Sequence, residues 1–376
     1  MPLRFLFFHI NIPIKKIKIL KYENVFLYYK KNPMIRYGYC CINMQLSSQG
    51  IRTGRAMIDR KFRLGGLQLA SDIALANAKD LLTILQWNEQ QGIRLFRIGS
   101  EIFPRWNHYE LRDLPGIDEI THHLRIAGDY ARAHNHRLTT HPGPFHILGS
   151  PDDVVVDNSI VGLERHSEMF DLMGYVPSFD NLINIHIGAT YNDKPGTVAR
   201  WLFNYARLSE SCRARLVVEN DDKASMYSVR ELYEYLHVPT RIPITFDYWH
   251  HTFNTGDISE QEAFFMARDT WSIHGATQCT HYSESRRREN QLLIERMFAH
   301  HGISLDTIEQ WPTFHKQYKE FTKIKEQAHA DFITQLPNTY GVDALDIEVE
   351  AKAKEQSLLQ LNVTCCQEIN NPIILI

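Results

Sequence analysis

The feature that most restricts the fold of this chain is a regular alternation of short apolar runs with longer helical patterns, which begins near Met34. Eight runs have the length and composition of buried β-strands, and they lie at 35–40, 93–99, 137–141, 182–188, 215–220, 242–247, 276–281 and 345–351. Helical patterns occur between them at 72–91, 118–134, 159–174, 195–210, 228–236 and 259–270. Strands that alternate with helices form parallel sheets, and eight such strands close a barrel. The sequence therefore predicts an α/β fold of the single TIM (β/α)8 barrel type.

Domain organisation follows from the same pattern. A chain of 376 residues is long enough for two or three domains, but one barrel can occupy about 250 residues or more. We expect one TIM-barrel domain over 34–356, with a single large insertion at 285–335 between strands seven and eight. A basic, poorly ordered N-terminal extension is expected at 1–33, and a C-terminal tail at 357–376.

The charge balance narrows the class of partner. The net charge is −3, but the extension holds seven basic residues and one acidic residue, so the remaining 34 basic and 43 acidic residues give −9. An acidic body argues against a protein that coats polyanions in general. It still allows a nucleic-acid site in which local basic patches lie beside bound cations.

Cysteine usage and the N-terminal segment indicate the compartment. The six cysteines include two adjacent pairs and no CxxC pair, which favours a reducing environment. The apolar start of the extension is interrupted by His9 and Asn11 and is shorter than the roughly 18 residues of a membrane-spanning helix. We therefore expect an intracellular protein, in the cytoplasm or, in a eukaryote, the nucleus, with no membrane partner.

Metal-binding residue types stand at the ends of six of the eight predicted strands. They are His141, His186, Glu219, Asp247 with His250, His281 and Glu350, and His108 lies in the loop after strand two. In a parallel barrel the carboxyl ends of all strands open on one face, so these side chains are expected to converge there. Imidazoles and carboxylates together can hold two or three divalent cations, and a carboxylate can bridge two of them. The pattern predicts a metal cluster at the C-terminal strand ends.

Each of these residues also has a simpler interpretation. A single histidine at a strand end is more often a hydrogen-bonded structural residue, as we expect for His251 beside His250. A lone carboxylate before a helix is more often an N-cap. The repetition favours the metal site, because burying unpaired polar groups at successive strand ends would cost several kcal/mol each.

The strand-end motifs also resemble a known family. In order along the chain they read MIRYGYC, LFRIGSEIFP, LTTHPGPF, IHIGATYNDK, LVVENDD, TFDYWHH, THYSES and EVEAKAKEQ. Over about residues 34–356 this set resembles the UV damage endonuclease family, which is distantly similar to the barrel-shaped endonuclease IV. The resemblance implies two or three divalent cations, with Mn²⁺ expected and Zn²⁺, Mg²⁺ and Co²⁺ as alternatives.

The resemblance also assigns roles to individual residues. It implies that the metal ligands are His108, His141, His186, Glu219, Asp247, His250, His281, Glu350 and also His329, which lies after the insertion. Three of them are expected to be catalytic. Glu219 would bridge cations, while Asp247 and Glu350 would hold one cation and orient the attacking water.

Expected DNA contacts fall into two groups. By resemblance, Tyr39 and Asn43 reach into the lesion pocket, and Pro144 with Phe145 occupies the position of a pair that wedges into the duplex. The predicted phosphate contacts are Arg97, Lys352 and the run Arg286, Arg287 and Arg288, although a solvated loop explains that run equally well.

Two residues depart from the family pattern. Pro144 stands where the family usually has glutamine, and this puts the lesion preference in question. Cys279 stands where members can carry a lysine that helps to bridge metals, and a cysteine cannot make that bridge.

The resulting hypothesis is a DNA repair endonuclease that acts as a monomer on damaged double-stranded DNA. It would nick the backbone 5′ to UV photoproducts such as pyrimidine dimers, with abasic sites as further substrates, and leave a 3′-hydroxyl and a 5′-phosphate. One alternative is a metal-dependent TIM-barrel sugar isomerase or hydrolase, which would not need Tyr39, Asn43 or an aromatic wedge at Phe145. Another is a non-cleaving damage-binding protein, which would bind irradiated DNA tightly without nicking it.

Overall fold

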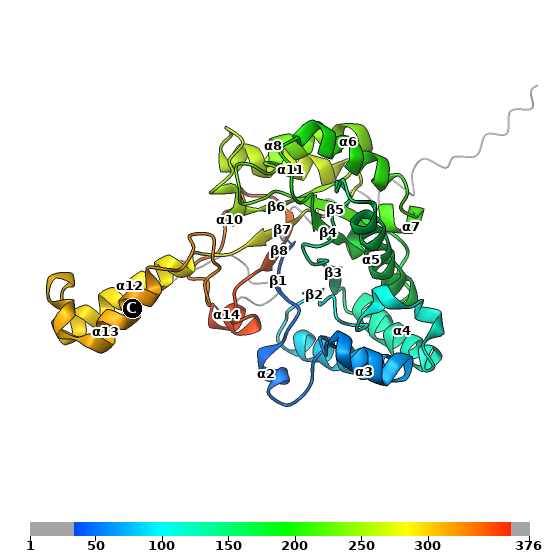
Figure 1. Ribbon diagram of the computed structural model, residues 1–376, viewed down its shortest axis with the longest axis horizontal. Helices are drawn as coiled ribbons and strands as arrows, with labels where there is room; N and C mark the ends of the chain where they lie inside the picture. Colours follow the sequence, from blue (N-terminus) through cyan, green and yellow to red (C-terminus); the bar gives the residue numbers. More distant parts are fainter. Residues whose placement is uncertain (1–33, 362–376) are drawn as a thin grey trace, which may run out of the picture.

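The computed structural model describes residues 34–361 and confirms the predicted barrel (Figure 1). Eight parallel strands pair in sequence order from β1 to β8, and β1 closes the sheet by pairing with β8. The strands are β1 Met34–Cys40, β2 Leu95–Ile98, β3 Arg137–Thr140, β4 Ile183–His186, β5 Leu216–Glu219, β6 Ile244–Asp247, β7 Cys279–Tyr282 and β8 Ala344–Val349. The predicted extension at 1–33 and the tail from 362 onward lie outside the described residues.

Helices surround the barrel, as Figure 1 shows. The α-helices that cover it or connect its strands are α2 Met44–Ser47, α3 Asp59–Gln90, α4 Ile117–Ala133, α5 Asp153–Leu172, α6 Lys194–Tyr205, α7 Glu210–Arg213, α8 Val229–Leu232, α9 Val238–Thr240, α10 Tyr248–His251, α11 Glu260–Ser272 and α14 Glu355–Gln360. Short 3-10 turns lie at Trp106–His108, Leu111–Asp113 and Phe179–Asn181, and a π-helical turn lies at Tyr233–His237.

Helix boundaries differ from the predicted ones, most clearly at α3 and at α6 with α7. Helix α3 begins at Asp59 rather than at 72, and it is interrupted at Gly66, whose φ of 56° and ψ of −152° are not helical. The predicted helix 195–210 is two helices, because Ser209 caps α7 by accepting a hydrogen bond from the Cys212 amide. Local capping and glycine conformation therefore outweigh the apolar periodicity at these points.

The insertion at 285–335 forms a helical hairpin that projects away from the barrel in Figure 1. It consists of α12 Arg286–His301, a 3-10 segment Leu305–Gln310 and α13 Pro312–Phe321. The chain then returns to the barrel at His329, which forms an isolated antiparallel bridge with Ser285.

The barrel interior contains buried charges in place of a purely apolar filling. On β8 the buried side chains of Asp346 and Glu348 alternate with Leu345, Ile347 and Val349 of the hydrophobic core, and Glu350 follows directly after the strand. Arg97 from β2 reaches both Glu348 and Glu350, although these strands are not neighbours in the sheet. TIM-barrel interiors are usually filled by branched apolar residues, so this acidic row is a distinctive feature of the chain.

Hydropathy of the described helices gives one further result. No helix in the range 34–361 is both long and apolar enough to cross a membrane.

Candidate metal centre

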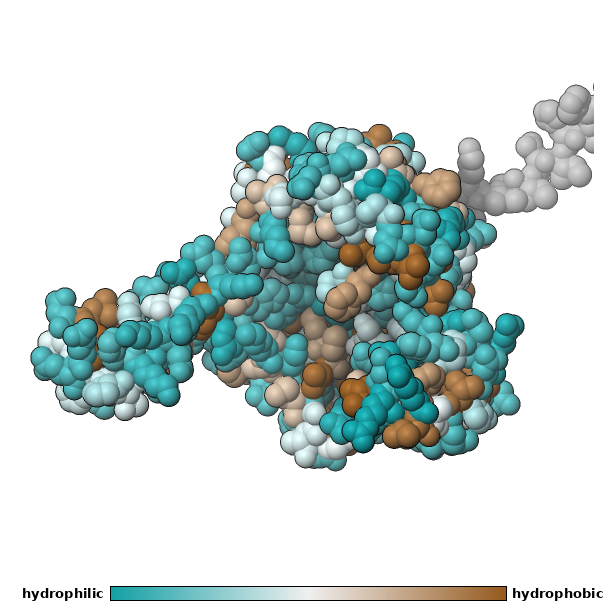
Figure 2. Space-filling view, in the orientation of Figure 1, coloured by the Kyte–Doolittle hydropathy of each residue, from teal (hydrophilic) through white to brown (hydrophobic). Residues whose placement is uncertain are grey.

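The barrel brings the predicted strand-end donors together on one face. Strands β4, β5 and β6 end at His186, Glu219 and Asp247, and His281 is the penultimate residue of β7. His141 follows directly after β3. The sheet register places His186 beside Glu219 and Asp247 beside His281. Parallel pairing of neighbouring strands is therefore the direct cause of the convergence. In Figure 2 a hollow surrounded by hydrophilic residues opens near the middle of the molecule.

The donor atoms form three groups, and two carboxylates are shared. The groups are His141, His186 and Glu219; Glu219, Asp247 and His250; and Asp247, His281 and Glu350. Within each group the ligand atoms lie within 4.8 Å of one another. Glu219 and Asp247 each belong to two groups, so each would be able to bind two neighbouring cations if all three groups held one.

Glu219 is the centre of this arrangement. Its carboxylate is only 1% exposed, and its oxygens lie 3.1 Å from Nε2 of His141 and 3.0 Å from Nδ1 of His281. Burial alone would raise the pKa of Glu219, but the surrounding imidazoles, His281 and His186 foremost, hold that pKa well below its ordinary value. The carboxylate is therefore ionised at neutral pH and available as a metal ligand.

An unpartnered donor atom shows that the side chains suit divalent cations. Asp247 Oδ2 is buried and has no hydrogen-bond partner among the described residues. A buried polar atom without a partner is costly, and a bound cation would satisfy it, since Asp247 belongs to two of the three donor groups. Imidazole nitrogen with carboxylate oxygen is a donor set that suits Mn²⁺ and Zn²⁺.

Supporting residues orient the donors, and two of them were not predicted. Glu348 accepts a hydrogen bond from Arg97 Nε at 2.6 Å and lies 3.2 Å from Nε2 of His281. Asp221 Oδ1 lies 3.1 Å from Nδ1 of His186. Carboxylates in such positions fix the orientation of ligand histidines. The sequence signals were the alternating acids of DIEVE and the acidic run that follows Glu219 in ENDD.

Arg97 is a structural counter-ion in the described structure. It is 6% exposed, and its guanidinium donates to Glu350 Oε1 at 2.5 Å and lies 2.7 Å from His281 Nε2. Its predicted contact with a DNA phosphate stays a prediction. Arg97 balances the negative charge of Glu348 and Glu350. Without this partner, burying the two charged carboxylates would be unfavourable.

The remaining two predicted ligands lie at different distances from the donor groups. His329 Nδ1 lies 3.5 Å from Glu350 Oε2, so His329 is at the edge of the centre. His108 is exposed and is not part of the three groups found among the described residues. Its Nε2 lies 2.8 Å from Arg105, and its ring packs against Phe62 at 5.6 Å. The metal role of His108 stays a prediction.

The predicted DNA contacts are divided between surface and interior. Phe145, in the loop after β3, is 84% exposed, and Pro144 beside it is also exposed. Tyr39 is fully buried, and its hydroxyl donates to Asn88 and accepts from Asn43, itself 1% exposed. The described structure therefore presents the wedge residues to solvent, whereas Tyr39 and Asn43 pack inside.

A pocket of about 400 Å³ adjoins the donor groups. It is lined by Cys40, Cys41, Arg97, Gln327, Ala328, His329, Glu350, Lys352 and Lys354. Two of its residues have unusual backbone conformations: Cys41 has a φ of 68° and Lys354 a φ of 54°. The volume is within the range of about 300–1,000 Å³ that small-molecule sites occupy. The pocket combines cationic side chains with the edge of the candidate metal centre.

Cys279, one of the two departures from the family pattern, lies in the protein interior. It is fully buried in a small apolar cluster with Leu182, Val217 and Trp271.

Two of the three arginines at 286–288 are engaged in ion pairs. Arg286 pairs with Asp331, and Arg287 pairs with Glu326. Only the third arginine of that run is left exposed without an ion pair among the described residues.

This chain is similar to known proteins over most of its length. The family described as UV-endonuclease UvdE matches residues 35–374. The UV-damage endonuclease of Schizosaccharomyces pombe is 31% identical over 353 residues, which cover 90% of this chain and 53% of that protein. A putative UV-damage endonuclease of Acanthamoeba polyphaga mimivirus is 30% identical, with 87% of this chain and 90% of that protein covered.

A solved structure supports the same relationship. The crystal structure of SacUVDE superposes with a TM-score of 0.68 at 26% identity, over 87% of this chain and 99% of that chain. The chain thus spans about half the length of the fission yeast relative, yet it aligns with nearly all of the solved one. With a closed barrel, strand-end donors and a family match over most of its length, this chain belongs to the UV-endonuclease UvdE family.

Proposed function

We propose that this protein is a DNA repair endonuclease that nicks damaged duplex DNA on the 5′ side of UV photoproducts, leaving a 3′-hydroxyl and a 5′-phosphate. Its cofactors would be two or three divalent cations, with Mn²⁺ as the expected metal. The observation that supports this proposal most is the sharing of Glu219 and Asp247 among three groups of donor atoms. Relatives in the same family carry the name UV-damage endonuclease.

The proposed reaction is hydrolysis of one phosphodiester bond, in which water adds to phosphorus and the 3′ oxygen of the neighbouring nucleotide departs. Divalent cations held by the three groups would stabilise the negative charge that develops on the phosphate oxygens. Glu219 and Asp247 would hold neighbouring cations at a fixed spacing, and Glu350 with Asp247 would orient the attacking water. Arg97 would keep Glu350 in place through its hydrogen bond.

Substrate binding would use the surface around the centre. Phe145 would insert into the duplex and stack on an exposed base, because it is a large aromatic side chain that is 84% exposed in the loop between β3 and α5. Lys352 and Lys354 would contact a phosphate of the bound strand in the adjoining pocket. Tyr39 and Asn43 would reach the lesion only with a rearrangement, since both are buried.

The test is a comparison of two glutamate variants. Glu219→Gln removes the shared carboxylate charge with little change of shape, so we expect Mn²⁺-dependent nicking of UV-irradiated supercoiled plasmid to fall by about 10- to 100-fold. Glu234→Gln removes a charge from an exposed position and should nick like the unchanged protein. Undiminished nicking by Glu219→Gln would rule out the proposed role of this centre.

A further inference from the structure

A short basic turn at the start of α3 is the strongest feature that the proposed chemistry does not use. We call residues 58–66 the basic turn; its sequence is IDRKFRLGG. Arg60, Lys61 and Arg63 are exposed, and none of them has a hydrogen bond or ion pair among the described residues. The one acidic residue of the turn, Asp59, is paired with Arg105. The turn therefore presents three uncompensated positive charges to solvent.

The basic turn has features that helix stability alone would not favour. Cations in the first turn of a helix are unfavourable, because the helix dipole is positive at its N-terminus. Two large apolar side chains are also exposed there, Leu64 at 81% and Ile58 at 64%. Three cations and two aliphatic side chains on one exposed turn are therefore better explained by a bound partner than by packing.

The backbone holds the turn at a fixed angle to the rest of α3. Gly66 has a φ of 56° and a ψ of −152°, a conformation available to glycine and very rarely to other residues. A Cβ atom on Gly65 would lie 2.6 Å from Leu69 Cβ, so this residue is also restricted to glycine. The pair of glycines thus separates the turn from the long part of the helix that packs on the barrel.

Ring contacts and hydrogen bonds connect the basic turn to the loop that follows β2. The ring of Phe62 lies 5.6 Å from His108 and 6.0 Å from Tyr109, and Arg105 bridges Asp59 and His108. His108 belongs to the loop between β2 and α4. In a parallel barrel such loops lie on the same face as the carboxyl ends of the strands. The turn therefore lies on the same face of the barrel as the candidate metal centre.

We infer that the basic turn binds the phosphate backbone of duplex DNA next to the cleaved site, with Arg60, Lys61 and Arg63 as the phosphate contacts. The inference rests on the proposed endonuclease function, because that function requires a polyanionic duplex to lie across this face. Charge complementarity selects the partner: guanidinium and ammonium groups without internal partners are the groups that neutralise DNA phosphates.

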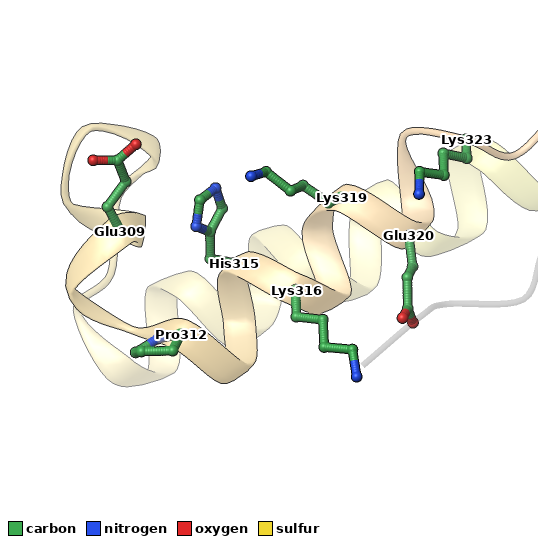
Figure 3. A pocket seen from close by; sticks show the side chains of 7 residues that line it. All are labelled: Glu309, Pro312, His315, Lys316, Lys319, Glu320 and Lys323. Atoms are coloured by element: carbon green, nitrogen blue, oxygen red, sulfur yellow. The ribbon is translucent and has the colours of Figure 1, made fainter.

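The helical hairpin is the competing basic surface, and its charges are arranged differently. In Figure 3 Lys319 and His315 extend to one side of α13, while Lys316 and Glu320 extend to the other. Glu309 and Glu320 line the same pocket as the three lysines at 316, 319 and 323. Mixed charges of this kind reduce the attraction for a phosphate backbone. The hairpin is therefore a suitable control with the same number of removable cations.

The experiment measures the salt dependence of binding to an undamaged duplex, with chelator present so that no strand is cut. In the variant that combines Arg60→Gln, Lys61→Gln and Arg63→Gln, we expect the plot of log affinity against log salt concentration to become less steep. The magnitude of its negative slope should decrease by about 3, since each phosphate contact contributes about 0.9. Between about 50 and about 200 mM salt, the unchanged protein should then lose roughly 40-fold more affinity than the variant. The control Lys316→Gln, Lys319→Gln and Lys323→Gln should retain the full slope.

The outcomes separate this inference from the proposed function. An unchanged slope in the basic-turn variant, or an equal fall in both variants, overturns the inference even if the unchanged protein nicks irradiated DNA. Failure of the unchanged protein to nick would instead count against the proposed function. Vesicles containing phosphatidylserine test the other polyanionic surface. Loss of vesicle binding in the variant, with an unchanged DNA slope, would assign the turn to lipid and overturn the inference.

Discussion

At the scale of single residues, the candidate centre depends on imidazoles that surround one buried carboxylate. Burial by itself lowers the pKa of a histidine, yet the pKa of His186 is raised to about 9 and that of His281 to about 10. The main opposing cause is the Coulombic attraction of ionised Glu219. In the metal-free protein both histidines therefore carry a proton at pH 7, and this proton occupies a position that a cation needs.

Metal binding should consequently release protons. At pH 7 we expect about two protons to be released from His186 and His281 when Mn²⁺ binds, and a further one from His250, whose pKa is also raised well above its ordinary value. The apparent affinity should rise as the pH increases toward 9, because the competing protons are then removed. Titration calorimetry in PIPES and in Tris buffer measures this release, since the two buffers differ in ionisation enthalpy. Equal heats in both buffers would show that His186 and His281 are not protonated competitors of the cation.

Phe145 gives a second prediction for a single residue. Its replacement by alanine should weaken binding to a duplex with one defined photoproduct by about 5- to 150-fold, because stacking on a base is worth about 1–3 kcal/mol. Phe203→Ala is the matched control, because Phe203 is also an exposed phenylalanine, 72% accessible, on α6. Fluorescence anisotropy with labelled duplex measures both. If the two variants bind equally well, Phe145 is not the wedge.

Sequence reasoning located some site residues and not others, for physical reasons. His141, His186 and Glu219 were predictable because a parallel sheet forces strand ends together whatever the details of the helices. The position of His108 depends on how one long loop folds, and no periodicity describes a loop. Glu348 was missed because its role appears only when β8 faces Arg97 from β2 across the barrel.

At the scale of elements, β8 determines the polarity of the barrel interior. Its acidic side chains each have a cationic partner from another strand: Asp346 is held by Arg36 and Arg137, while Glu348 is held by Arg97. Arg97 also lowers the pKa of Glu348 to about 2, although burial opposes this shift. Ion pairs, and not hydrophobic contacts alone, therefore stabilise the face of β8 that points into the barrel.

Replacing Glu348 by glutamine should destabilise the fold. The change leaves the buried guanidinium of Arg97 with one fewer carboxylate partner, and breaking a buried ion pair costs about 3–5 kcal/mol. The free energy of unfolding of the metal-free protein, measured in urea, should fall by that amount. Asp343→Asn, at an exposed position just before β8, should change it by less than about 0.5 kcal/mol. A loss of similar size in both variants would contradict the role given to Glu348.

Prediction of the elements succeeded where apolar runs were short and buried. All eight observed strands overlap the predicted runs, since little else suits a stretch such as LVVE between helices. The hairpin α12–α13 was not predicted, because its apolar residues are scattered and it packs on little else. The break at Gly66 was also missed, although the adjacent glycines of the basic turn were the available signal.

At the scale of the whole molecule, the candidate metal centre and several exposed aromatic and basic side chains lie on the same face of the barrel. The donor groups, the exposed Phe145 loop after β3 and the basic turn near His108 belong to loops or strand ends of the same face. Under the proposed function, this arrangement would let a chain with a net charge of −3 bind DNA, because its carboxylates would hold cations and its exposed basic side chains would face the duplex.

The most direct test of the central claim is to map the cut in a duplex that contains one pyrimidine dimer at a known position. With Mn²⁺ present, we predict a single nick immediately 5′ to the dimer, with a 3′-hydroxyl that a polymerase extends and a 5′-phosphate that a ligase accepts. With chelator present, we predict no cut. Tight binding without a nick in Mn²⁺, Mg²⁺, Zn²⁺ or Co²⁺, or a cut at another position, would contradict the account.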